Sequence, residues 1–229
     1  MYILLLIVFA GLSFFVGGRL KRRFREYSEI PTTSGLSGAE IAQRMLLDNN
    51  IHDVKVQSVE GELTDHYNPA NKTINLSREV YLGRNVSAAA VAAHETGHAV
   101  QHATVYAMLG FRSAMVPVVN LSSRLMNIIF IVGIFGAFAL PNFGPQLVMI
   151  LILAQAVITL FSLVTLPVEF DASARALQWL NMSKITVGEE HDKAKNALRW
   201  AASTYVVATL SAISQLIYFV MAFAGGGDD

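Results

Sequence analysis

Three long stretches of the chain contain no Asp, Glu, Lys or Arg: residues 1–18, 125–168 and 200–227. A helix needs about 20 apolar residues to cross a hydrocarbon layer about 30 Å thick, so these stretches are long enough, or nearly so, for membrane crossings. Only 15% of all residues are charged, and all of them lie outside these stretches, where their share is about a quarter, as in soluble domains. The sequence therefore predicts a mostly helical integral membrane protein with a soluble part.

The first stretch is followed by five cations: Arg19, Lys21, Arg22, Arg23 and Arg25. A signal peptide has its positive charges before the apolar run, so this order indicates an uncleaved anchor. By the positive-inside rule the cations stay in the cytoplasm, and the N-terminus lies outside.

Residues 125–168 are too many for one crossing and are interrupted by the turn-rich residues 141–145. This pattern predicts a membrane hairpin with one helix ending near Leu140 and the next covering about residues 146–166. Residues 104–123 fit either an interfacial helix or the start of the second crossing, since they are apolar but contain a proline and an arginine.

Residues 200–224 make the fourth crossing, so both termini are expected outside and both soluble segments in the cytoplasm. The predicted organisation is a transmembrane anchor (1–20), a cytoplasmic zincin-like part (21–123), a transmembrane hairpin (124–166), a cytoplasmic helical segment (167–199), a transmembrane helix (200–224) and a tail (225–229).

The longer soluble segment is expected to be a small α+β unit. Ser37 can cap a helix over residues 38–48, with Glu40 completing a capping box. Ser87 can cap a second helix that opens with alanines. The predicted strands are one around residues 54–59 and a hairpin formed by residues 63–67 and 73–76.

The alanine-rich helix contains the H-E-x-x-H pattern at His94, Glu95 and His98. Residues four apart lie on one helix face, so the two histidines can hold one metal ion while Glu95 reaches a metal-activated water. Two imidazoles, a third ligand and a water suit zinc.

Glu169 is the candidate for the third ligand. The membrane hairpin returns the chain to the side of the histidines, and Pro167 can open a helix there. His102 lies about 12 Å along the helix from His94, too far to share an ion, and is expected on the surface or beside the site or substrate. Thr104 stands where a metzincin would have its third histidine.

The segments AHETGHAVQH (93–102) and PVEFDAS (167–173), with the four crossings, resemble the YugP-type neutral zinc metallopeptidases of bacterial membranes and, more distantly, HtpX-like and CAAX prenyl proteases. The resemblance implies a zincin-like fold in which a glutamate after a membrane hairpin completes the zinc site. It also implies an aspartate four residues later, where this chain has Ser173, while Asp171 lies about 200° round the helix. An edge strand for extended substrate is implied as well, with residues 63–67 or 73–76 as candidates.

Two further side chains are weaker candidates. His66 beside Tyr67 can help to hold an oxyanion, but a hairpin histidine is more often simply solvated. Arg175 can pair with Asp171 or Glu95, or form an ordinary surface ion pair.

These features predict a zinc endopeptidase that holds one Zn²⁺ per chain with His94, His98 and Glu169 and uses Glu95 as general base. Its partners would be a protein or peptide substrate and the lipid bilayer. A net charge of zero argues against nucleic acid as a partner, and the lack of cysteine excludes disulfides and thiolate ligands. The alternatives are a catalytically silent zinc-binding scaffold and, less favoured because the crossings lack formal charge, a metal transporter. Substrate, oligomeric state and regulatory partners are not predicted.

Overall fold

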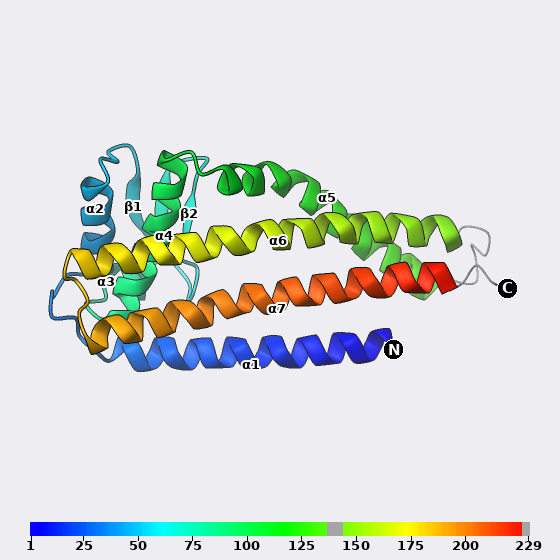
Figure 1. The fold of residues 1–229 in the computed structure, drawn as a ribbon, viewed down its shortest axis with the longest axis horizontal. Helices are drawn as coiled ribbons and strands as arrows, with labels where there is room; N and C mark the ends of the chain where they lie inside the picture. The colour runs from blue at the N-terminus through cyan, green and yellow to red at the C-terminus, as the bar shows by residue number, and fades with distance from the viewer. Residues whose placement is uncertain (137–143, 226–229) are drawn as a thin grey trace. The chain divides into compact units, whose positions relative to one another are not determined.

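The computed structural model describes residues 1–136 and 144–225. Within these ranges, side chains are described for all residues except 132–136 and 144–145. In chain order the elements are α1 (Tyr2–Ser28), α2 (Gly38–Asp48), β1 (Lys55–Val59), β2 (His66–Asn68), β3 (Thr73–Ser77), α3 (Arg78–Leu82), α4 (Val86–Ala103), α5 (Ala107–Gly136), α6 (Gly144–Met182) and α7 (Glu189–Gly225) (Figure 1). They form two compact units, one from residues 1–14, 111–166 and 205–229 and the other from residues 15–110 and 167–204. The predicted mostly helical membrane architecture with a small α+β part is confirmed.

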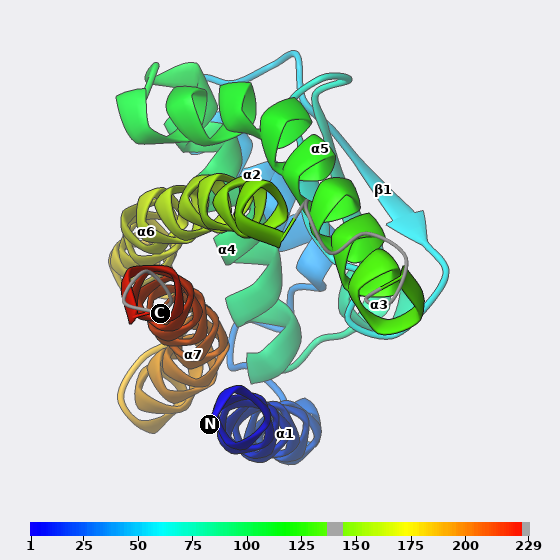
Figure 2. The same ribbon diagram turned by 90° about the vertical axis from the view of Figure 1, so that its right-hand side faces the viewer.

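Four helices of the described chain are long and apolar enough to cross a membrane: α1, α5, α6 and α7. Figure 2 views α1, α6 and α7 close to end-on. α5 begins at Ala107 and continues through Pro117, so the ambiguous segment is the first part of a long apolar helix. The predicted turn at residues 141–145 lies largely outside the described residues, as does most of the C-terminal tail.

Within the first unit, polar side chains of the apolar helices bond to neighbouring helices. The Gln155 amide donates to the Ala212 carbonyl oxygen at 3.0 Å, and the Thr159 hydroxyl lies 3.1 Å from the same oxygen. Tyr2 stacks on Tyr218 with ring centroids 5.0 Å apart. Because hydrocarbon offers no hydrogen-bond partners, such internal bonding suits helices that lie in a bilayer.

The second unit contains a three-stranded mixed sheet in the order β1-β3-β2. β1 pairs with β3 in parallel and β2 pairs with β3 antiparallel, which confirms the predicted hairpin, with its first strand at His66–Asn68. β3 is central and buried at every position, so the proposal of residues 73–76 as an edge strand is wrong. The other candidate segment contributes to β2, which does lie at an edge.

The predicted helix after Ser37 is confirmed, and so is its capping box with Glu40. Two expected helix starts are wrong. α4 begins one residue before Ser87, and its cap is Asn85, whose side-chain oxygen accepts a hydrogen bond from the Ala88 amide. Pro167 does not open a helix but lies inside α6, which runs on from the apolar segment before it to Met182.

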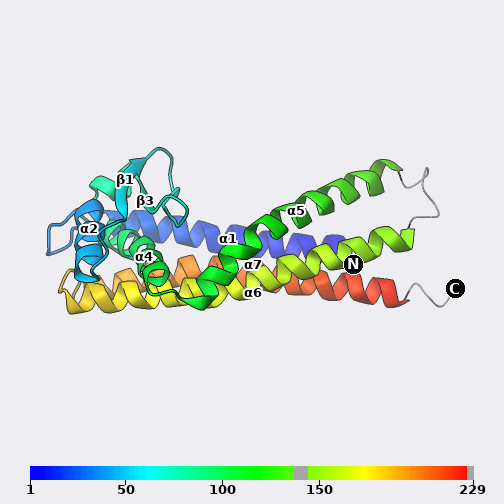
Figure 3. The same cartoon turned by 90° about the horizontal axis from the view of Figure 1, so that it is seen from above.

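α4 is the central helix of the second unit. Nearly all its residues are buried, and its buried alanines pack in one cluster with Ile41 of α2, Ile74 of β3, and Ala176 and Leu180 of α6. Figure 3 shows α4 between the sheet and the end of α6. This burial fixes the helix that carries the H-E-x-x-H pattern from several sides.

Candidate metal centre

α4 presents both motif histidines on one face, as the i, i+4 spacing predicts. The ring centroids of His94 and His98 lie 4.8 Å apart in an edge-to-face arrangement. The side chain of His94 is 13% exposed and that of His98 is 9% exposed. The pair is therefore nearly enclosed.

The C-terminal part of α6 brings Glu169 to this pair. Val168, Ala172, Ala176 and Leu180 recur at every fourth position, are fully buried, and form the stripe by which α6 packs into the second unit. Glu169 follows the first of these and is only 2% exposed. Its position thus depends on the packing of a continuous helix rather than on a new helix start at Pro167.

Gly97 permits this packing at the centre of the motif. A Cβ atom on Gly97 would lie 2.6 Å from the carbonyl oxygen of Ala172 in α6. Real Cβ atoms do not approach backbone oxygen so closely, so only glycine lets the two backbones meet at this point. The close approach lies between the two histidines in sequence and three residues beyond Glu169.

The three candidate ligands converge on one point. Oε2 of Glu169 lies 3.3 Å from Nε2 of His94 and 3.6 Å from Nε2 of His98. Ligands about 2 Å from a tetrahedral ion lie about 3.3 Å from one another. The ligand atoms of the three residues all lie within 4.8 Å of one another, so two imidazoles and a carboxylate fit the donor set and dimensions of a catalytic zinc site.

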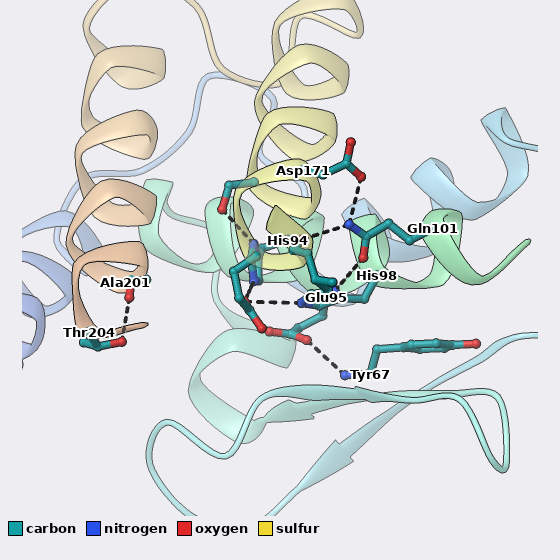
Figure 4. Close-up of polar contacts among 11 residues, drawn as sticks. Tyr67, His94, Glu95, His98, Gln101, Asp171, Ala201 and Thr204 are labelled. Carbon is teal, nitrogen blue, oxygen red and sulfur yellow. Dashed lines mark hydrogen bonds and ion pairs between the residues drawn. The ribbon is translucent and has the colours of Figure 1, made fainter. Parts of the chain in front are cut away.

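Glu95 does not belong to this cluster. Its Oε2 accepts a hydrogen bond of 2.9 Å from the backbone amide of Tyr67 in β2 (Figure 4). Tyr67 is paired in register with Ile74 of β3, and its amide donates to Glu95 rather than to β3. β2 is the outer strand of the sheet, and no other described strand pairs with its second edge. The general-base candidate therefore faces the free edge of the sheet.

Tyr67 also contacts α4 through its side chain. Its hydroxyl lies 2.7 Å from Nδ1 of His102. Burial and then the nearby Asp53 carboxylate raise the pKa of Tyr67 to about 12, so the hydroxyl remains protonated at neutral pH. His102 thus lies beside the site in contact with the edge strand, and it is not part of the metal-binding cluster found among the described residues.

Each motif histidine has a neutral partner at its other ring nitrogen. The Ser173 hydroxyl lies 3.1 Å from Nδ1 of His94. The residue that departs from the pattern of the distant relatives therefore still contacts a metal-facing histidine. Nδ1 of His98 lies 3.0 Å from the side-chain oxygen of Gln101.

Gln101 is a residue of the site that the sequence motifs do not reveal, although it stands three residues after His98 and so on a neighbouring position of the same helix face. Its amide nitrogen donates to Oδ2 of Asp171 at 2.8 Å, and the Arg175 Nε donates to the same oxygen at 2.6 Å (Figure 4 shows the contact with Asp171). Arg175 thus pairs with Asp171, one of its two expected carboxylates.

Two titratable side chains of the hairpin have local roles. His66 is exposed, and its Nδ1 lies 2.7 Å from the carbonyl oxygen of Thr64. Asp65 accepts hydrogen bonds from the amide and hydroxyl of Ser77. Burial raises the pKa of Asp65, although the Ser77 bonds oppose that shift. The contacts of His66 therefore place it in its own loop rather than beside the metal-facing residues.

The chain is similar to known proteins along nearly its whole length. Residues 2–224 match the model of a family described as "Putative neutral zinc metallopeptidase". The chain is 40% identical over 230 residues to "Putative membrane protease YugP" of Bacillus subtilis (strain 168), an alignment that covers 100% of this chain and 99% of that protein. No solved structure matches. With four apolar helices, the chain is a multi-pass membrane protein, and it belongs to the neutral zinc metallopeptidase family.

Proposed function

We propose that this protein is a membrane zinc endopeptidase whose ion is held by His94, His98 and Glu169. The observation that carries the proposal is the convergence of two imidazole nitrogens and a buried carboxylate oxygen on one point, next to a further carboxylate that faces a sheet edge. Family membership and the protease name of the Bacillus relative support zinc and peptide chemistry.

A zinc ion bound there supplies a Lewis acid that polarises the scissile carbonyl and lowers the pKa of water to about 7. The chain provides the remaining functions. Glu95 takes the proton from the attacking water and returns it to the leaving amine. Enclosure by α4 and α6 keeps the dielectric low around the ligands, which strengthens their electrostatic interactions.

We further propose that the free edge of β2 binds the substrate as an added strand. The backbone amide of Tyr67 faces this edge and donates a hydrogen bond to the Glu95 carboxylate. An extended peptide paired with β2 would thus pass beside the general base. In this arrangement the substrate carbonyl competes with Glu95 for the Tyr67 amide, which would free the carboxylate to accept a proton.

The sidedness of the membrane is also part of the proposal. We propose single crossings at residues 1–20 and 200–224 and a hairpin at residues 124–166 that crosses twice, with the metal centre on the cytoplasmic side and both termini outside. The chain has no cysteine, so single cysteines can report sidedness directly. His52 and Asn181 are exposed, and cysteines there should resist an impermeant thiol reagent in intact cells, whereas cysteines at Asn142 and Asp229 should react. Equal labelling of His52→Cys and Asn142→Cys would contradict this topology.

The decisive experiment for the activity uses Glu95→Gln in the full-length protein in proteoliposomes. Zinc content and hydrolysis of β-casein and a quenched peptide library are measured, with Glu60→Gln, an exposed carboxylate, as control. The Glu95 variant should keep zinc and lose about 10²–10⁴-fold in rate, because general-base catalysis contributes that much. Zinc binding with no Glu95-dependent cleavage would instead favour the catalytically silent scaffold.

A further inference from the structure

Gln101 is the most constrained polar side chain beside the metal centre. It is fully buried and makes three polar contacts. Its side-chain oxygen lies 3.0 Å from Nδ1 of His98, and its nitrogen donates at 2.8 Å to both the Val168 carbonyl oxygen and the Asp171 carboxylate.

These partners allow only one orientation of the amide. A carbonyl oxygen and a carboxylate accept hydrogen bonds and cannot donate them. The NH₂ group of Gln101 must therefore face Val168 and Asp171, and the oxygen must face His98. Since that oxygen only accepts, Nδ1 of His98 must carry the hydrogen. In a neutral imidazole the other nitrogen, Nε2, then presents its lone pair.

Nε2 of His98 is the atom that points to Oε2 of Glu169, 3.6 Å away. We therefore propose that Gln101 is a positioning residue that locks His98 in the tautomer able to bind zinc through Nε2, an inference that rests on the proposed zinc site. The ion pair of Asp171 and Arg175 holds the Gln101 amide in turn. Through Gln101, this pair determines that Nδ1 of His98 carries the hydrogen.

His94 differs in this respect. Its Nδ1 contacts the Ser173 hydroxyl, which can both donate and accept and so does not select a tautomer by itself. The lock is therefore a property of the His98 side of the site. Its components come from two helices: Gln101 from α4, and Val168, Asp171 and Arg175 from α6.

A charge exchange tests the lock. Zinc affinity is measured by chelator competition in the full-length purified protein for wild type, Gln101→Met, Gln101→Glu, Asp171→Asn and the double variant Gln101→Glu/Asp171→Asn. The cobalt(II) visible spectrum of each is recorded as a report on the ligand field, and the melting temperature of each metal-free protein as a control for folding.

Gln101→Met removes the acceptor from His98, and Gln101→Glu places a carboxylate against Asp171, so each should weaken zinc binding about 10- to 100-fold and alter the cobalt spectrum. Asp171→Asn alone should cost about two- to fivefold, because its amide oxygen still accepts from Gln101 but without charge. In the double variant the asparagine amide at position 171 donates to the new carboxylate, which accepts from His98, but the Val168 carbonyl oxygen loses its donor. Zinc affinity should therefore lie between that of Gln101→Glu and that of Asp171→Asn.

Wild-type zinc affinity and a wild-type cobalt spectrum in Gln101→Met would overturn the lock while leaving the zinc site intact. A wild-type protein that binds no zinc would overturn the proposed function itself. If Gln101→Glu does not fold alone, recovery of folded, zinc-binding protein in the double variant supports the lock, and Gln101→Met, which introduces no charge, provides the test of affinity.

Discussion

α4 and α6 bring their residues to the candidate metal centre by different routes. α4 carries His94 and His98 one turn apart, so the spacing of the pair follows from helix geometry alone. α6 is a helix of 39 residues in which Glu169 lies after a long apolar part, and only packing against α4 gives it a position near the histidines. One half of the centre is thus set by local structure and the other half by a tertiary contact.

The tertiary contact should be the more fragile of the two. Gly97→Ala would place a Cβ atom 2.6 Å from the Ala172 carbonyl oxygen, and because that neighbour is backbone, α6 must move and carry Glu169 with it. We expect zinc affinity to fall about 10- to 100-fold and the free energy of unfolding to fall by about 1–3 kcal/mol. Competition titration and thermal unfolding measure the two effects.

Gly110→Ala is the matched control for this variant. Gly110 is an exposed helical glycine, and a Cβ atom added to it would meet nothing within 4 Å. The substitution should leave zinc binding unchanged and raise stability by up to about 1 kcal/mol through helix propensity. If Gly97→Ala behaved like Gly110→Ala, close backbone contact would not be what places Glu169.

A smaller loss of zinc affinity is expected when the Ser173 hydroxyl, which connects α6 to His94 of α4, is removed. Ser173→Ala removes the partner of the His94 Nδ1, and zinc affinity should fall about 10-fold, at the lower end of such losses. Ser173→Asp should restore or tighten binding, because a carboxylate is a stronger acceptor for a ligand imidazole. Ser203→Ala is the control, since that hydroxyl bonds to a carbonyl of its own helix. Equal zinc affinity in Ser173→Ala and Ser203→Ala would remove Ser173 from the site.

The smallest effect should come from the N-terminus of α4. Asn85→Ala removes the cap and should lower the free energy of unfolding by about 0.5–2 kcal/mol. Zinc affinity should stay nearly constant, since the spacing of His94 and His98 is internal to the helix. Chemical unfolding measures the loss, and Ser87→Ala should cost less. The reverse ranking would mean that Ser87 is the effective cap.

This contrast also explains what could be predicted from the sequence. The capping box at Ser37, the membrane helices and the H-E-x-x-H helix follow from local spacing and hydropathy, and all are present. The predicted start of α4 is wrong because Ser87 and Asn85 are both good capping residues, and the choice depends on where the preceding chain turns. The predicted helix start at Pro167 is wrong because proline suits the first turn of a helix, whereas here α6 continues through it.

Glu169 and Gln101 show how far the candidate site could be predicted from the sequence. Glu169 could be proposed because the hairpin returns the chain to one side of the membrane. The role of Gln101 depends on contacts with Val168 and Asp171, nearly 70 residues away, and no spacing in α4 encodes them. The same holds for Ser173, whose contact with His94 depends on the close approach at Gly97.

The most direct test of a zinc site shared by the two helices is zinc content per chain in wild type, Glu169→Ala and His102→Ala after dialysis against a chelator. His102 is the matched control, because it lies on α4 beside the site but outside the cluster. We predict one zinc per chain in wild type and in His102→Ala, and almost none in Glu169→Ala. Full zinc in Glu169→Ala together with its loss in His102→Ala would contradict the assignment of α6 as the source of the third ligand.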